Sequence, residues 1–162
     1  MSAGGLLRYR ELSTTIQDDC LLFVQPWHVA MTVSVNADRH RLFQALTIPE
    51  YMEMWISVPN AIQGQQIAVT CTSESYRILA CSGACLMACI GGFYRVCRRT
   101  KLVFTWKRVP ADTYPSLVTM RLRGDFARTT LRLSHSGLAS KAEYLWHRAF
   151  WECSMERLRA LF

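Results

Sequence analysis

A regular alternation of apolar and polar residues begins just after Pro26. Val29, Met31, Val33 and Val35 fall on one face, and the residues between them are small or polar. Successive side chains of a strand point to opposite faces of its sheet. This period of two therefore predicts a half-buried β-strand that starts near residue 28.

Two short helices are predicted after this strand. Asn36 is a suitable N-cap, and residues 37–46 follow it with Asp38 in the first turn, where a negative charge favours a helix. Pro49 is well tolerated in a first turn because the amide proton it lacks would have no partner there. A second helix is therefore expected over residues 49–55.

From Gln65 to His135 the pattern changes to short apolar runs separated by turn residues. Ser82-Gly83 and Gly124-Asp125 are typical of two-residue hairpin turns, and Gly91-Gly92 predicts a bulge or bend in a long strand. Strands are expected over residues 66–72, 75–81, 84–96, 101–108, 116–123 and 126–134.

The C-terminal segment predicts one long helix. Ser140 and Glu143 have the spacing of a capping box, which satisfies two free amides of the first turn. Downstream, one face is polar and the other would pack on the sheet. The packing face carries Tyr144, His147, Trp151, Ser154, Leu158 and Leu161, and the polar face carries Arg148, Glu152, Glu156 and Arg159. Sequential hairpins followed by one such helix indicate an α+β fold, with a curved antiparallel sheet of about six to seven strands around the helix.

The length of 162 residues is typical of a single domain. We expect residues 27–162 to form this domain and residues 1–26 to be an N-terminal extension lying on it. The first residues lack the apolar core of a signal peptide, and no apolar stretch reaches the roughly 18 residues of a membrane span. The hydrophobic content of 51% excludes a disordered chain. A cytoplasmic location is therefore expected.

No metal site, cofactor site or catalytic motif stands out in the sequence. Seven cysteines without an export signal predict reduced, buried thiols. Cys85 and Cys89 on one strand would lie about 13 Å apart, too far to share a zinc ion. Neither a nucleophile elbow nor a phosphate-binding loop is present. We expect no metal and no cofactor, and the missing motifs argue against an enzyme without deciding the question.

Several short motifs follow one another in a characteristic order between residues 28 and 162. They are Val33 to Ala37, Leu42 to Thr47, Pro49-Glu50, Trp55, Gly92 to Val96, Leu102 to Trp106, Ser116 to Thr119, Thr129 to Leu131, Ser134 to Leu138, His147 and Phe150-Trp151. Their order resembles the domain of the activator of 90-kDa heat-shock protein ATPase and its homologues. This family lies in the superfamily of START domains, polyketide cyclases and the birch-pollen allergen (SRPBCC). The resemblance implies the helix-grip fold, in which the sheet wraps around the C-terminal helix.

The helix-grip fold implies a cavity between the sheet and the long helix, and we expect a non-catalytic module that binds a small apolar or amphipathic ligand there. The expected ligand-binding residues are Trp55, Phe104, Trp106, Met120, Tyr144, His147 and Trp151. The opening should lie towards Trp55 and His147. In the alternative, these rings fill the space completely, which Phe150 favours because the family usually has glycine at that position.

Two other functions stay open at this point. The first is an enzyme like polyketide cyclases and aromatases, in which His147 or His135 would act as acid or base. The second is a co-chaperone-like module that binds an acidic protein through a basic sheet face, since the net charge of +7 favours anionic partners. A tight turn at Gly124-Asp125 would place Arg121 opposite Arg128 on that face. Aromatic residues are scarce there, which argues against nucleic acid.

The strands over residues 76–81 and 84–90 are apolar on both faces. One of these faces carries Leu79, Cys81, Leu86 and Ile90. A strand face of this kind needs a cover. Either residues 1–26 or a second copy of the chain would supply it, and we expect a homodimer.

Overall fold

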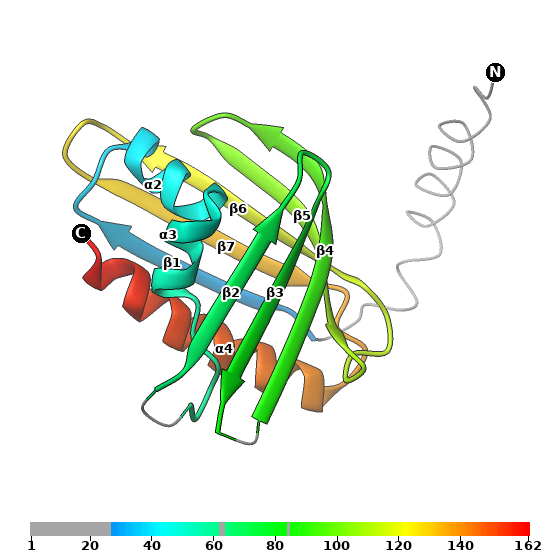
Figure 1. The fold of residues 1–162 in the computed structure, drawn as a ribbon. Helices are drawn as coiled ribbons and strands as arrows, with labels where there is room; N and C mark the ends of the chain where they lie inside the picture. The colour runs from blue at the N-terminus through cyan, green and yellow to red at the C-terminus, as the bar shows by residue number, and fades with distance from the viewer. Residues whose placement is uncertain (1–26, 62–63, 84) are drawn as a thin grey trace, which may run out of the picture.

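The computed structural model describes residues 27–61, 64–83 and 85–162, so the expectations for residues 1–26 lie outside it (Figure 1). In chain order the elements are β1 Val29–Val35, α2 Arg39–Thr47, α3 Pro49–Trp55, β2 Gln66–Cys71, β3 Ser75–Ser82, β4 Cys85–Cys97, β5 Lys101–Val109, β6 Ser116–Gly124, β7 Thr129–Ser136 and α4 Lys141–Ala160. Within these ranges no helix has both the length and the apolar character needed to cross a membrane.

The seven strands form one sheet in the order β1-β7-β6-β5-β4-β3-β2, and every neighbouring pair is antiparallel. The sheet curls around α4, and α2 and α3 lie between the two edge strands β1 and β2 (Figure 1). This is the predicted helix-grip architecture, and the α+β fold class is confirmed. Below, the face of the sheet towards α4 is called the inner face, and the opposite one the outer face.

The start of α2 differs from the prediction. Asp38, and not Asn36, is the N-cap, and its carboxylate accepts hydrogen bonds from the amides of His40 and Arg41 at 2.7 and 2.9 Å. The Asn36 side chain instead accepts a hydrogen bond from Arg128 at 3.4 Å. The aspartate serves better as the cap because its charge also complements the positive end of the helix dipole. The bounds of α3 are those predicted.

The β6–β7 connection is longer than the predicted two-residue turn. Gly124 pairs with Thr129, so four residues join the strands, and the Asp125 carboxylate accepts hydrogen bonds from the amides of Ala127 and Arg128. Such a side-chain-closed turn replaces a tight hairpin turn. The predicted opposition of Arg121 and Arg128 was wrong as a result.

The predicted irregularity in β4 lies slightly downstream of the glycines. The register against β5 shifts between Phe93 and Arg95. Gly91 has a different role, because a Cβ atom there would collide with the Thr105 carbonyl and the Tyr76 hydroxyl. These two groups are joined by a hydrogen bond of 2.6 Å from the tyrosine. Gly91 therefore permits β4 to pass close to this contact.

The first turn of α4 carries half of the predicted capping box. The Ser140 hydroxyl accepts a hydrogen bond from the Glu143 amide at 3.1 Å. The buried Glu143 carboxylate accepts from the amides of Ala139 and Thr113, at 2.9 and 3.2 Å, and not from the Ser140 amide. This carboxylate therefore ties the β5–β6 connection to the start of α4. Four of the six residues of the predicted packing face, from His147 to Leu158, are fully or almost fully buried.

Candidate functional site

The space between the inner face of the sheet and α4 contains a small apolar void. Its volume is about 20 Å³, and every side chain that lines it is apolar or aromatic. Five of the expected ligand-binding residues, Trp55, Phe104, Trp106, Met120 and Trp151, are among them, and each is buried. A void of this size holds about one water molecule. The alternative in which the rings fill the space therefore describes this conformation better than an open cavity.

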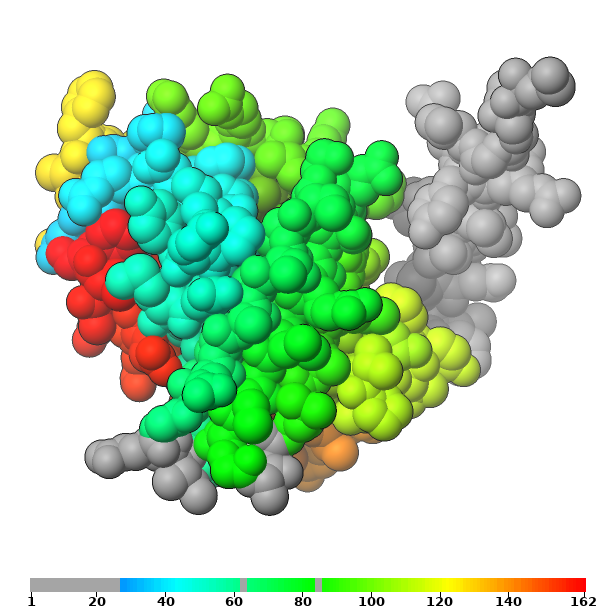
Figure 2. All heavy atoms as spheres, in the orientation of Figure 1, coloured from blue at the N-terminus to red at the C-terminus, as the bar shows by residue number. Residues whose placement is uncertain are grey.

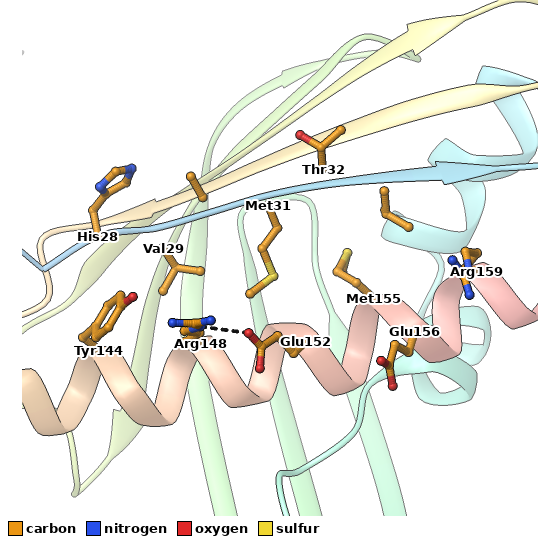
Figure 3. Close-up of a pocket in the computed structure, with 12 residues that line it drawn as sticks. His28, Val29, Met31, Thr32, Tyr144, Arg148, Glu152, Met155, Glu156 and Arg159 are labelled. Carbon is orange, nitrogen blue, oxygen red and sulfur yellow. Dashed lines mark hydrogen bonds and ion pairs between the residues drawn. The ribbon is translucent and has the colours of Figure 1, made fainter.

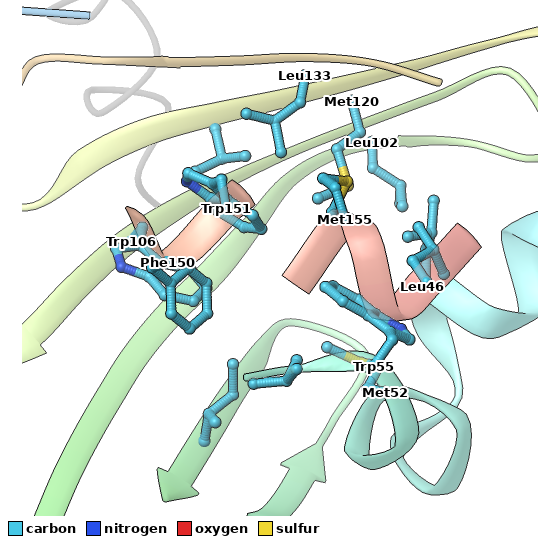
Figure 4. Packing of buried hydrophobic residues seen from close by; sticks show 14 of the residues in the cluster. Leu46, Met52, Trp55, Leu102, Trp106, Met120, Leu133, Phe150, Trp151 and Met155 are labelled. Carbon is cyan, nitrogen blue, oxygen red and sulfur yellow. The ribbon is translucent and has the colours of Figure 1, made fainter. Parts of the chain in front are cut away.

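Phe150 explains why so little space remains. Its side chain is fully buried, with its ring centroid 5.2 Å from that of Trp106 and 5.0 Å from that of Trp151 (Figure 4). The residue before Trp151 thus adds another large ring to the lining of the cavity. A smaller residue here would leave room between β5 and α4.

Tyr144 and His147 do not line this void. Tyr144 lies in an open groove of about 430 Å³ between β1 and α4, with its ring 5.6 Å from that of Trp27 (Figure 3). The groove also contains the Arg148–Glu152 ion pair of 2.8 Å, whose side chains are about half exposed. Ion pairs of such exposure contribute little to stability. Tyr144 and His147 are therefore separated from the apolar part of the predicted site.

His147 belongs to a buried polar cluster at the N-terminal half of α4. Its Nε2 lies 3.1 Å from the Asp112 carboxylate, which also forms an ion pair with Arg108 at 2.6 Å. Burial alone would raise the pKa of Asp112, but the hydrogen bonds from His147 and Arg108 outweigh it and hold the pKa at about 2. Asp112 is therefore a carboxylate, and His147 donates to it through Nε2.

A second buried chain of hydrogen bonds contains His135 of β7. The Trp151 indole donates to His135 Nδ1 at 2.9 Å, and His135 Nε2 lies 2.6 Å from the Ser116 hydroxyl. An indole can only donate, so Nδ1 is the acceptor, and a neutral His135 carries its proton on Nε2. Ser116 then accepts from His135 and donates to the Trp106 carbonyl at 3.0 Å. Burial, and to a smaller extent the nearby His147 ring, lower the pKa of His135 to about 3.

These directions decide what the His135–Ser116 pair can do chemically. A histidine activates a serine by accepting its proton, as in Ser-His catalysis. Here both nitrogens of His135 are occupied, and the ring donates to the hydroxyl. In this arrangement the pair joins β6, β7 and α4 and does not form an activated nucleophile.

Two buried polar atoms in this region have no hydrogen-bond partner among the described residues: the indole Nε1 of Trp106 and Nδ1 of His147. Trp106 also lines the apolar void. Buried donors are normally paired, and an unpaired one is unfavourable. An acceptor atom that reached this indole would therefore bind favourably.

The sequence alone did not predict this polar cluster. Arg108 and Asp112 are four residues apart on either side of Pro110, which is a weak local signal for an ion pair. The partners of Asp112 and His135 on α4 come from more than ten residues away along the chain. No spacing rule connects such positions.

The described cysteines differ partly from the prediction. Cys89 is buried, and burial raises the pKa of its thiol, but Cys81 is exposed and Cys71, Cys97 and Cys153 are half-buried. All five are free thiols. The expectation of uniformly buried cysteines was wrong, since Cys81 points to the outer face of β3. Over the part of the chain that the structure describes, no group of three or more histidines, cysteines and acids could hold a metal ion.

Similar structures support the fold. A protein from Chromobacterium violaceum, CV1439, matches with a TM-score of 0.72 and 16% identity, over 85% of this chain and 97% of that one. CalU16 from Micromonospora echinospora matches with a TM-score of 0.60 and 16% identity, over 83% and 73% of the two chains. DynU16, from the dynemicin biosynthetic locus, has a TM-score of 0.64 and 21% identity, over 82% of this chain and 46% of that one.

The sequence comparisons agree with the resemblance of the short motifs. No curated protein is a significant match. The family model described as "Activator of Hsp90 ATPase homolog 1-like protein" matches residues 36–162, which include every element from α2 to α4. The motif order, the helix-grip fold and this match agree, and the chain is a member of the family of Activator of Hsp90 ATPase homolog 1-like proteins.

Proposed function

We propose that this protein is a non-catalytic module that binds a small amphipathic ligand between the inner face of the sheet and α4. The observation that carries the proposal is the unpaired indole N–H of Trp106 in a lining of apolar and aromatic side chains. A ligand with an apolar body and one hydrogen-bond acceptor would satisfy this donor. Ligand sites commonly combine apolar walls with few polar groups in this way.

Binding requires the cavity to open. The void of about 20 Å³ is far smaller than the roughly 300 Å³ or more of common ligand sites. Phe150 is the side chain whose displacement would open it, because its ring projects from α4 and packs against that of Trp106, at 5.2 Å between centroids. Met52 and Met120 also line the void, and methionines adapt readily to a new neighbour. The ligand would therefore replace Phe150 as the partner of the Trp106 ring.

Catalysis by His147 or His135 does not fit the geometry of the void. A cyclase-like enzyme would need His147 or His135 at the ligand. Neither ring lines the void, and His135 has both nitrogens occupied. Among the side chains that line the void, the Trp106 indole carries the unpaired donor, and an indole binds an acceptor but does not transfer protons at ordinary pH.

Calorimetry with two probes of similar shape tests the assignment. Acetophenone carries a carbonyl acceptor and ethylbenzene does not. We expect Phe150→Ala to bind both probes more tightly than the native protein does, since removing the ring enlarges the void. In this background, Trp106→Phe should weaken acetophenone by about tenfold, in the range of one hydrogen bond, and leave ethylbenzene nearly unchanged.

Trp55→Phe is the matched control. Trp55 lines the same void, but its indole already donates to the Ala45 carbonyl at 2.7 Å. This change should affect both probes equally. Failure of the Phe150→Ala protein to bind either probe, together with no small molecule retained by native protein in native mass spectrometry, would refute the proposal.

A further inference from the structure

The outer face of the sheet has an open hollow that is lined by three arginines. The hollow has a volume of about 520 Å³ and lies over β1, β7 and β6. Arg121, Arg123 and Arg132 line it together with the hydroxyl groups of Thr32, Thr119 and Ser134. We call it the arginine hollow. Guanidinium and hydroxyl groups are the donors that typically bind phosphate oxygens.

The charges around the arginine hollow are not balanced. Arg121 lies directly opposite Arg132 on β7 and opposite Lys101 on β5, so three cations form one row across three strands. Like charges placed opposite each other destabilise a sheet. None of the acidic residues in the described ranges lies in a strand. Nor does any of the three arginines of the hollow form an ion pair with a described carboxylate.

A fully exposed aromatic ring lies in the connection between β6 and β7, the strands that carry Arg121 and Arg132. Phe126, in the β6–β7 connection, is 97% exposed. The backbone around it is held by the hydrogen bonds that the Asp125 carboxylate accepts from Ala127 and Arg128. This connection projects from the body of the molecule, in yellow at the upper left of Figure 2. The turn therefore exposes an apolar ring between Arg123 and Arg128 in the chain, and both arginines are exposed.

We propose that this end of the outer face docks on the surface of a bilayer that contains anionic phospholipids. The arginine hollow would bind headgroup phosphates, and Phe126 would insert among the acyl chains near the headgroups. Peripheral attachment to such a surface combines the insertion of apolar side chains with the attraction of cations to anionic headgroups. An acidic protein would also satisfy the cations, but it would need a matching pocket for a ring that protrudes this far. The inference does not depend on the proposed ligand cavity.

The test is sedimentation with vesicles, using the whole chain. We expect binding to phosphatidylcholine vesicles that contain phosphatidylglycerol and little binding to phosphatidylcholine alone. Phe126→Ala should weaken binding by about tenfold although no charge changes, because the variant has no apolar ring to bury among the acyl chains. The matched control is Tyr114→Ala, which removes another exposed ring (68% exposed) from the β5–β6 connection and should leave binding unchanged.

Charge reversal tests the arginine hollow. Arg121→Glu with Arg132→Glu should weaken binding by at least about 25-fold, since each cation near such a surface contributes about fivefold. Lys141→Glu with Arg159→Glu makes the same change in net charge on the exposed surface of α4 and is the control. Circular dichroism would verify that every variant is folded.

Three results would overturn the proposal. In the first, both charge reversals weaken binding equally, so that only net charge matters. In the second, Phe126→Ala binds as the native protein does. In the third, the native protein binds poly-glutamate or duplex DNA at a salt concentration where it does not bind the anionic vesicles, and the partner is then an acidic protein or a nucleic acid.

Discussion

The indole nitrogen of Trp151 donates a hydrogen bond of 2.9 Å to Nδ1 of His135, and this single contact sets the proton position of a buried histidine. It also joins α4 to β7 close to the ring of Trp106, whose centroid lies 5.1 Å from that of Trp151. A polar connection of this kind orients α4 on the sheet more specifically than apolar packing does.

Trp151→Phe should therefore destabilise the fold more than the loss of apolar contact explains. The change leaves Nδ1 of His135 buried without a donor, and we expect a loss of about 2 kcal/mol in the free energy of unfolding. Urea denaturation measures it. A double-mutant cycle with His135→Phe isolates the pair, and the effects of the two changes should be less than additive. Strictly additive losses would show that the hydrogen bond is unimportant.

The stability of the protein should fall in mild acid because of His135. Its pKa is lowered to about 3 in the fold, whereas an unfolded histidine titrates near 6.5. Between these values the unfolded chain binds a proton that the folded chain does not, so stability falls as the pH falls from about 6.5 to 3. The slope from this residue is at most about 1.4 kcal/mol per pH unit. His135→Gln should flatten the curve in denaturation at several pH values, and an unchanged slope would contradict the assignment.

Asp112→Ala should be among the most destabilising single changes in the protein. It leaves Arg108 and His147 without their shared partner in a buried position, which typically destabilises a fold by about 3 kcal/mol or more. The contribution of this carboxylate is present above about pH 4 and is lost as the pH falls through the folded pKa of about 2. Glu152→Ala, which breaks the exposed pair with Arg148, should change stability by less than about 0.5 kcal/mol in the same assay.

Two neighbouring glycines should respond very differently to alanine. A Cβ atom at Gly91 meets the Thr105 carbonyl and the Tyr76 hydroxyl, whereas one at Gly92 finds only ordinary contacts. We expect Gly91→Ala to lower the midpoint of thermal unfolding and to cost about 2 kcal/mol or more, as overpacking does. Gly92→Ala should have little effect. Equal effects of the two changes would mean that β4 can move away from Thr105 easily.

Exposed apolar residues of β3 and β4 on the outer face lead us to predict a homodimer. Leu79, Leu86 and Ile90 are 41%, 71% and 42% exposed in the described chain. Burial of this strip against a second copy would remove it from water. Analytical ultracentrifugation should show a dimer, and Leu86→Ser should shift it towards monomer. A monomeric native protein at high concentration would exclude this interface.

Local patterns determined most of the secondary structure. The bounds of α3 could be predicted because Pro49 restricts where a helix can begin, and β1 because its alternation is uninterrupted. The errors arose where side chains compete for the same backbone groups. Asp38 displaced Asn36 as the cap, and the Asp125 carboxylate lengthened the β6–β7 connection. Both competitions are decided by small energy differences that the pattern of apolar residues does not contain.

For the candidate site, too, some features follow from local patterns and others from the tertiary structure. The sequence by itself indicated that Leu102, Phe104 and Trp106 share one face of their strand, because the strand period assigns each residue to a face. Only the tertiary structure decided that Phe150 nearly fills the cavity, that Tyr144 lies in a different groove, and that His147 and His135 are held by Asp112 and Trp151. Periodicity specifies a direction for each side chain, but the space left between two elements and the partner of a buried polar atom depend on distances between residues far apart in the chain.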